Sequence, residues 1–394
     1  MHLNRLDFSR LSVLLVTGMF AAMLVSATSS CSLGYYHQAV SGHLSILKQR
    51  KPIKDILASD SDTLNEVQRN KLGLILDIRE IAEKSLALPV ENGYSSYVDI
   101  GREFVVWNVF AAQEFSVAPQ QWCYPIIGCA SYRGYYSENA ARKYAKKQAE
   151  KDLETFVGGV RAYSTLGWFN DPVLNTFISQ NDLSIVALLI HEISHKIMYA
   201  KNDTAFNESF ATAIELFGVE VWLHHHQGSI PQQTIEEFYK RRRIKSDFIQ
   251  LVLETRNELD TIYKGKLADD EKRKAKSDIF EKLKSDLVKL DADYGYQTLY
   301  SPWSNDLNNA KIAPVNSYHQ WVSAIRSRLD KTLAQSNCDI SNLLLDKCQQ
   351  LLKTFYDEIK SLAKLGTEQR HLILEDWQAS ASERLQIKAK NDLE

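Results

Sequence analysis

His191 and His195 stand four positions apart in a largely apolar run, and this spacing constrains the fold more than any other feature of the 394-residue chain. Nearly every side chain from Leu183 to Ile190 is apolar, which predicts a buried helix that begins near Asp182, its N-cap, and runs to about residue 200. Residues four apart lie on one face of a helix, so both imidazoles can reach one metal ion. Glu192, next to His191, is placed to take a proton from a metal-bound water.

Zinc suits such a pair of histidines, since it binds two imidazoles and one further protein ligand and keeps one position open. Two surface histidines are a weaker interpretation, because polar side chains on a buried helix need partners. A second helix, predicted from about Phe206 to His226, offers the third ligand. Glu208 stands thirteen positions after His195, which leaves room for one chain reversal that sets the two helices side by side. We therefore expect one zinc ion held by His191, His195 and Glu208.

Other side chains near the second helix leave alternatives open. Glu208 can also be interpreted as an ordinary first-turn glutamate, favoured by the helix dipole. Glu215 lies two turns beyond it on the same face, so we expect Glu215 to orient a ligand histidine. Adjacent histidines on a helix point in different directions, which favours a surface position for a triple-histidine run. The alternative third ligands are Asp203, Glu215, Glu220 and His224–His226.

The composition argues against several classes of protein. Only 16 glycines and 8 prolines occur, which excludes collagen-like, proline-rich and low-complexity chains. The 47 basic and 49 acidic residues nearly cancel, so the charge typical of a nucleic-acid-binding protein is missing. No protein partner can be inferred from the sequence.

Residues 1–30 have the features of a secretory signal peptide. Arg5 and Arg10 precede an apolar run from Leu11 to Val25, which is short for a membrane span of about 20 residues. Small residues then lead to Cys31, in a pattern that resembles a bacterial lipoprotein processing site. We expect lipidation of Cys31 and a periplasmic protein of the bacterial cell envelope, anchored by lipid to the outer membrane. Cleavage after Ala27 would leave a soluble secreted form, and a permanent N-terminal anchor helix is a further alternative.

The other four cysteines form two local pairs, Cys123 with Cys129 and Cys338 with Cys348. Export implies an oxidising compartment, so two short-range disulfides are the simplest interpretation, although four cysteines allow three connectivities. A zinc cluster fits less well, because neither pair has CxxC spacing and no histidine lies nearby.

Helical patterns dominate and predict an α+β fold that is mostly helical. A charge-dense stretch at 232–292 is divided by Gly265 into two amphipathic helices, which we expect to form an antiparallel hairpin with a solvated charged face. We expect residues 31–394 to form one domain, with this hairpin as an insertion and residues 319–394 as C-terminal helices. The other predicted helices are 35–47, 64–86, 138–156, 319–336, 341–364 and 367–389, and the predicted strands are 104–110, 115–117 and 163–169.

The sequence resembles known metallopeptidases in several segments. HExxH followed by Asn207 and Glu208 at a helix start resembles the gluzincin pattern, and residues 207–211 look like the NEGFA segment of aminopeptidase N-type enzymes. In those enzymes the glutamate is the third zinc ligand. A closer resemblance is to a family of bacterial predicted aminopeptidases, many of them lipoproteins, and it covers most of the chain from Cys31 to about Trp321. The segments that carry it are 34–40, 106–109, 132–135, 162–169 and 191–212.

This resemblance implies a zincin-like core that hydrolyses peptides with a zinc-activated water. Glu192 is then the general base, and Tyr318 is our first candidate for stabilising the oxyanion. We expect residues 163–169 to bind the substrate backbone as an edge strand. An aminopeptidase also needs a carboxylate for the free amine, with Glu114, Glu138, Asp171 and Glu215 as candidates. Further residues expected near the metal or the substrate are Asn207, Glu215, Tyr163, Asn309 and His319.

The resemblance indicates the peptidase class more firmly than the mode of cleavage. A zinc aminopeptidase is the expectation, and a zinc endopeptidase or oligopeptidase is its near alternative. A different class of protein is a non-catalytic envelope lipoprotein in which zinc only stabilises the fold. The presence of Glu192 argues against that class, because a purely structural zinc site needs no base.

Overall fold

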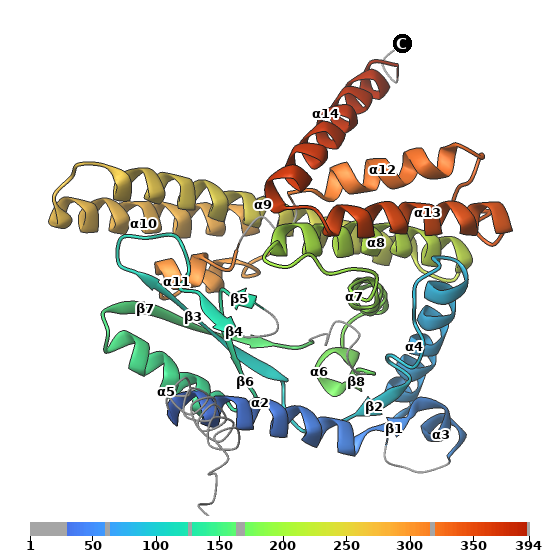
Figure 1. Cartoon of the computed structure of the whole chain (residues 1–394), viewed down its shortest axis with the longest axis horizontal. Helices are drawn as coiled ribbons and strands as arrows, with labels where there is room; N and C mark the ends of the chain where they lie inside the picture. Colours follow the sequence, from blue (N-terminus) through green and yellow to red (C-terminus); the bar gives the residue numbers. More distant parts are fainter. Residues whose placement is uncertain (1–29, 60–63, 125–127, 163–169, 316–319, 392–394) are drawn as a thin grey trace, which may run out of the picture. The chain divides into compact units, whose positions relative to one another are not determined.

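The computed structural model describes residues 30–59, 64–124, 128–162, 170–315 and 320–391, and their fold is mostly helical with small sheets, as the sequence predicts (Figure 1). The chain divides into two compact units, residues 1–49 and 50–394. Helix α2 (Ser30–Gln49) is the described part of the first unit, and every other element named below belongs to the second. Among the described helices, none has the length and apolar composition that a membrane crossing requires.

The described strands form three small sheets, with the orders β1-β2-β8, β6-β3-β7 and β4-β5. The strands are β1 (Lys51–Pro52), β2 (Ser96–Val98), β3 (Val106–Gln113), β4 (Trp122–Tyr124), β5 (Gly128–Ala130), β6 (Arg133–Tyr135), β7 (Leu153–Val160) and β8 (Val173–Leu174). The shorter helices and those near the sheets are α3 (Ile53–Ala58), α4 (Glu66–Lys84), α5 (Glu138–Ala149), α6 (Asn175–Ile178), η1 (Ser301–Ser304) and α11 (Asn309–Ile312).

Helices α7 (Asp182–Ser194) and α8 (Thr204–His225) pack against each other, and α4 packs against both. Both central helices are predominantly apolar, which explains why they are buried on most sides. Gly218 permits their close approach, because a Cβ at this position would lie 2.6 Å from Cδ1 of Ile190. The histidine-bearing helix and the following helix are therefore held at a short separation.

The ends of these helices differ slightly from the prediction. Asn181 caps α7 by accepting a 2.9 Å hydrogen bond from the backbone N–H of Ser184, so the prediction of Asp182 as the cap is wrong by one residue. Helix α7 ends at Ser194 rather than near Ala200. The backbone of Ala200 is instead bound by a side chain of α8, in the contact described below.

The sheet β6-β3-β7 departs from the prediction in two places. The helix predicted over 138–156 ends at Ala149, because Asp152 takes a positive φ of 59° and turns the chain into strand β7. Residues 115–117 form no strand. Phe115 and Val117 instead pack against the hydrophobic cluster formed by two long helices, α9 (Gln232–Lys264) and α10 (Asp269–Asp293).

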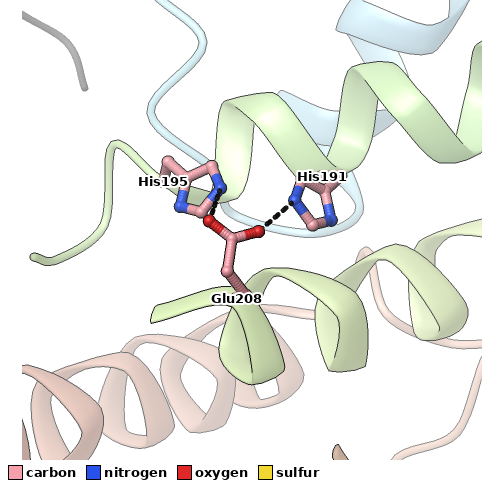
Figure 2. Close-up of side chains that lie close together, drawn as sticks. All are labelled: His191, His195 and Glu208. Carbon is pink, nitrogen blue, oxygen red and sulfur yellow. Dashed lines mark hydrogen bonds and ion pairs between the residues drawn. The ribbon is translucent and has the colours of Figure 1, made fainter. Parts of the chain in front are cut away.

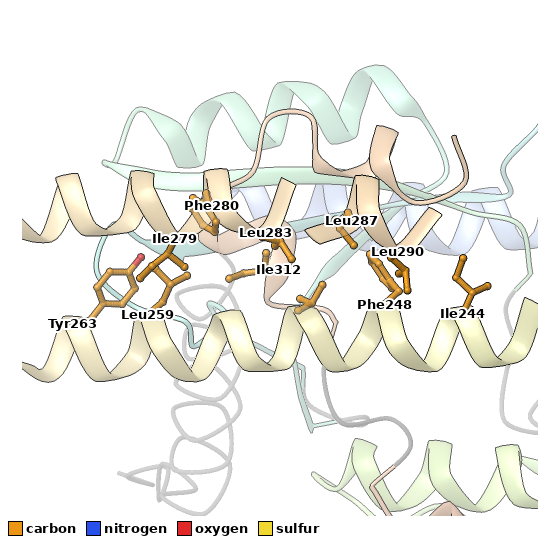
Figure 3. Packing of buried hydrophobic residues seen from close by; sticks show 11 residues of the cluster. Ile244, Phe248, Leu259, Tyr263, Ile279, Phe280, Leu283, Leu287, Leu290 and Ile312 are labelled. Atoms are coloured by element: carbon orange, nitrogen blue, oxygen red, sulfur yellow. The ribbon is translucent and has the colours of Figure 1, made fainter. Parts of the chain in front are cut away.

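The charge-dense stretch forms α9 (Gln232–Lys264) and α10 (Asp269–Asp293), which pack along each other and divide at Gly265, as predicted. Their facing side chains form a buried cluster, shown in Figure 3, which Ile312 of α11 joins. We expected the charged side chains of this hairpin to lie on a solvated face, but some of them contact other parts of the protein instead. Arg242 and Lys276 bind carboxylates of other elements, and Arg256 donates to the carbonyl of Val315 at 3.0 Å.

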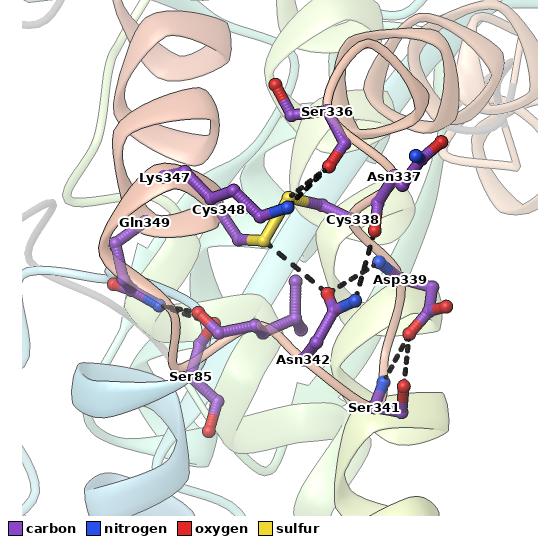
Figure 4. The surroundings of a disulfide bond; sticks show 11 residues. Ser85, Ser336, Asn337, Cys338, Asp339, Ser341, Asn342, Lys347, Cys348 and Gln349 are labelled. Atoms are coloured by element: carbon purple, nitrogen blue, oxygen red, sulfur yellow. Dashed lines mark hydrogen bonds between the residues drawn. A yellow bond between two sulfur atoms is a disulfide. The ribbon is translucent and has the colours of Figure 1, made fainter.

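The C-terminal helices are α12 (Val322–Ala334), α13 (Asp346–Ala363) and α14 (Thr367–Asn391), and α12 packs against α8 and both of the others. The predicted cysteine pairs are both disulfide-bonded: Cys123–Cys129 joins β4 to β5, and Cys338–Cys348 closes the connection between α12 and α13 (Figure 4). Cys31 falls within α2, and the predicted signal peptide lies outside the described residues except for Ser30.

Candidate metal centre

Helices α7 and α8 bring His191, His195 and Glu208 together. The potential ligand atoms of these residues all lie within 4.8 Å of one another. Figure 2 shows the Glu208 carboxylate reaching from α8 toward the imidazoles of His191, in α7, and of His195, the residue directly after α7. Within the described ranges, this is the one group of three or more histidine, cysteine or acidic residues close enough to hold a metal ion.

The spacing of these atoms fits a metal ion. Nε2 of His191 lies 3.3 Å from Oε2 of Glu208, and Nε2 of His195 lies 3.7 Å from Oε1. Ligand atoms that sit about 2.1 Å from a tetrahedral zinc ion are roughly 3.4 Å apart. The two imidazoles thus face the Glu208 carboxylate at separations close to this value, and one ligand atom from each of the three residues would leave one position for water or substrate.

The electrostatics also favour a cation between these residues. Burial lowers the pKa of His191, but hydrogen bonds to Glu208 and Glu215 outweigh it and raise that pKa to about 10. Burial lowers the pKa of His195 to about 4. The carboxylates thus stabilise a positive charge at His191, which a bound metal ion supplies in place of the proton.

Glu215 and Arg242 extend the centre beyond the three potential ligands. Oε2 of Glu215 lies 3.1 Å from Nδ1 of His191, and its other oxygen, Oε1, accepts a hydrogen bond from Arg242 of α9. Burial raises the pKa of Glu215, but the hydrogen bond from His191 and the Arg242 charge outweigh it and lower that pKa to about 2. No pattern in the sequence distinguishes Arg242 from its neighbours. Its only signal was the run Arg241–Arg243, which does not show which arginine turns inward.

Glu192 lines a small cavity on the side of α7. Burial raises the pKa of Glu192 to about 7, with Glu208 and Asp171 adding to the rise and His191 opposing it. The cavity has a volume of about 10 Å³, enough for one water-sized group. Its walls are mainly apolar, with two carboxylates among them. The lining residues are Tyr94, Ala162, Asp171, Pro172, Leu174, Phe177, Leu188, Leu189 and Glu192.

The side chain of Asn207, in the first turn of α8, binds the backbone of the segment between α7 and α8. Its buried amide accepts from the N–H of Ala200 at 2.8 Å and donates to the carbonyl of Ala200 at 2.9 Å. Asp203 caps the same helix by accepting from the N–H of Phe206 at 3.0 Å. These contacts hold the connection between α7 and α8, and they fix the helix turn that carries Glu208.

Several other predicted residues lie elsewhere. Asn309 is fully buried in α11, where it accepts from the hydroxyl of Tyr263 at 3.0 Å and donates to backbone carbonyls of 113 and 114. The triple-histidine run makes separate contacts: His224 with Gln227, His225 with Ser85 and His226 with Asp77. Three further candidates, Tyr163, Tyr318 and His319, lie outside the described residues.

Comparison with known proteins gave one match. A family model described as "Putative aminopeptidase" matches residues 34–374, which is most of the chain. The same comparisons found no match among curated proteins and none among solved structures.

Proposed function

The chain belongs to the "Putative aminopeptidase" family, and from this membership we propose that it is a zinc-dependent aminopeptidase with a zincin-like core. The observation that carries the proposal is the group His191, His195 and Glu208, with Glu192 next to the first ligand. Two imidazoles and a carboxylate form a known catalytic zinc ligand set, and an adjacent base can activate the water for peptide hydrolysis.

We assign each residue of the site a separate role in peptide hydrolysis. Zinc, when bound, would lower the pKa of a water molecule and polarise the scissile carbonyl. Glu192 accepts the proton of the attacking water and passes it to the leaving amine. We retain Tyr318, with Tyr163 as the second choice, for stabilising the oxyanion, and residues 163–169 for binding the substrate backbone. His191, His195 and Glu208 hold the metal.

Asp171 is the carboxylate that we propose binds the free amine of the substrate. Glu114 is engaged by Arg273 through both oxygens, at 2.7 and 3.1 Å, and Glu138 is engaged by Arg142. Glu215 binds His191 and Arg242, as described above. Asp171 is buried and lines the small cavity beside Glu192, so its carboxylate is placed next to the proposed base, where the amine end of the substrate would lie.

We propose that the protein works in the bacterial cell envelope, on peptides, with lipid at Cys31 anchoring it to the outer membrane. The two disulfides suit an oxidising compartment. A signal peptide over residues 1–30 fits the same location, and cleavage after Ala27 would give the soluble secreted form. Mass spectrometry of the mature N-terminus separates these two forms.

The decisive experiment combines zinc analysis with hydrolysis of aminoacyl reporters and internally quenched peptides. We expect one zinc ion per chain, cleavage of reporters with a free amine, and loss of cleavage in Glu192→Gln with zinc retained. Equal activity of this variant would exclude the mechanism. Cleavage of amine-blocked quenched peptides would indicate an endopeptidase or oligopeptidase, and bound zinc without any cleavage would indicate a non-catalytic lipoprotein.

Asp171→Asn tests the mode of cleavage separately. Loss of a hydrogen bond to a charged group costs about 1.5–3 kcal/mol, so we expect KM for free-amine reporters to rise about ten- to a hundredfold. Zinc content should stay unchanged, because Asp171 is not among the three potential ligands. Glu138→Gln, at an exposed carboxylate paired with Arg142, is the matched control and should leave KM unchanged.

A further inference from the structure

We infer that Arg242 is a positioning residue of the metal centre, which holds Glu215 and through it the metal-binding face of His191. This inference rests on the proposed metal site, and it makes the charged hairpin a part of that site. Arg242 lies on α9, and its guanidinium donates to Oε1 of Glu215. Glu215 is the carboxylate whose other oxygen lies 3.1 Å from Nδ1 of His191.

The contact at Nδ1 decides which nitrogen of His191 is available to a metal. When Nδ1 carries the proton and donates it to Glu215, Nε2 keeps its lone pair and faces Glu208 at 3.3 Å. A carboxylate that accepts from a ligand histidine fixes both the tautomer and the orientation of the ring. Glu215 can do this only if its own position is fixed.

Arg242 fixes that position because it engages the second oxygen of the same carboxylate. The side chains of Arg242 and Glu215 are 26% and 14% exposed, so water competes little for this ion pair. The Arg242 guanidinium also lies over the ring of Phe238, 5.6 Å from its centroid, one turn earlier on α9. Without Arg242, Glu215 would keep its bond to His191 and lose the partner that prevents rotation of its carboxylate.

The neighbours of Arg242 in the sequence provide matched controls. Arg241 pairs with Glu237 one turn away on the surface, at 2.7 Å, and Arg243 is exposed. The three arginines are adjacent on one helix, yet within the described part of the chain Arg242 alone among them contacts a residue that touches a potential metal ligand. An effect at Arg242 that is absent at Arg243 therefore reports the contact with Glu215, not the loss of positive charge from α9.

The test measures zinc affinity of the full chain by competition with a chromophoric chelator, in Arg242→Met, Arg243→Met, Glu215→Gln and the double variant at 242 and 215. Partners of metal ligands affect metal affinity by about ten- to a hundredfold. We expect about a tenfold loss for Arg242→Met, an equal or larger loss for Glu215→Gln, and no change for Arg243→Met. In the Glu215→Gln background, Arg242→Met should cause no further loss, because the two residues act in series.

Independent losses that multiply in the double variant would overturn the inference, as would unchanged zinc affinity in Arg242→Met. If Arg242→Met fails to fold, Arg242→Lys replaces it, with a smaller loss of zinc affinity expected because a single ammonium orients a carboxylate less well. The absorption spectrum of the cobalt-substituted protein gives a second readout of ligand geometry. Zinc affinity is measured without any substrate, so failure of the proposed peptidase activity would leave this result interpretable.

Discussion

Cδ1 of Ile190 lies so close to Gly218 that a Cβ added to the glycine would stand only 2.6 Å away. Ile190 directly precedes His191, so the separation of α7 and α8 at the metal centre depends on the missing side chain at position 218. We predict that Gly218→Ala lowers the free energy of unfolding by about 1–3 kcal/mol, because overpacking outweighs the better helix propensity of alanine. Urea denaturation measures this change.

Gly73→Ala is the matched control for that prediction. Gly73 also lies inside a helix, α4, but a Cβ there would meet no heavy atom within 4 Å. This variant should gain up to about 1 kcal/mol from helix propensity alone. A Gly218→Ala protein as stable as Gly73→Ala would contradict the argument from close packing.

Metal removal should destabilise the folded chain. A ligand that binds only the folded state adds about 2.7 kcal/mol of stability at a free concentration one hundred times its Kd. We therefore predict a lower Tm after chelation and recovery on adding zinc, with Glu208→Gln weakening the recovery. His224→Ala should respond to zinc like the parent, because His224 contacts Gln227 away from the three potential ligands. A lost response in His224→Ala would point to the triple-histidine run as the site.

The ion pair between Arg370 and Asp203 should contribute strongly to stability. Both side chains are only 2% exposed, and removing Arg370 takes away the guanidinium that compensates the buried Asp203 carboxylate, with His371 as its remaining partner from α14. We predict that Arg370→Met costs about 3–5 kcal/mol in urea denaturation. Lys274→Met, at an exposed pair with Asp278, should change stability by less than about 0.5 kcal/mol. Similar losses of stability in Arg370→Met and Lys274→Met would show that burial of the ion pair does not matter.

Asp291 gives a prediction for acid pH. This buried carboxylate accepts hydrogen bonds from the backbone N–H groups of Leu299, Tyr300 and Ser301, at 2.8–2.9 Å. Burial raises its pKa, but these bonds outweigh burial and hold the pKa below the usual 3.8. A carboxylate whose pKa is lower in the folded than in the unfolded state stabilises the fold at pH values above its unfolded-state pKa. This stabilisation is lost as the pH falls through the folded-state pKa.

To test this, the free energy of unfolding is measured as a function of pH for the parent and for Asp291→Asn. At pH 7 the variant should be less stable by about 1–3 kcal/mol, because the backbone donors lose their charged acceptor. The difference between the two proteins should narrow as the pH falls below about 4. A difference that stays constant from pH 7 to pH 3 would show that ionisation of Asp291 contributes nothing.

The parts of the site that depend on local spacing could be predicted from the sequence. His191 lies in the last turn of α7 and His195 caps its C-terminal end, one turn later. Glu208 follows after one chain reversal, so periodicity and loop length were enough to group the three residues. Arg242 could not be found this way, because its contact depends on how α9 passes α8, and three adjacent arginines share the same pattern. The contacts of Asn309 could not be predicted for a similar reason, since its buried amide binds Tyr263 and the backbone of residues 113 and 114, which are distant in the sequence.

The same distinction applies to the fold. Long helices with clear periodicity, such as α9 and α10, were predicted with nearly correct ends. Strand β7 was missed, because its short sequence follows a charged helix and contains two adjacent glycines, so its pairing with β3 carries the strand assignment. The segment after α7 is not helical, and its Ala200 backbone is bound by the side chain of Asn207, a contact that no pattern within α7 could indicate.

The contacts of Asp203 also bear on when the site can form. This residue caps the helix that carries Glu208, and it is bound by Arg370 and His371 of α14, which follow it by 167 and 168 positions. A chain that is still being synthesised lacks these partners until residues 370 and 371 have emerged. The turn that presents Glu208 therefore reaches its full stability only after α14 has formed, and a zinc site built on it would be delayed until then.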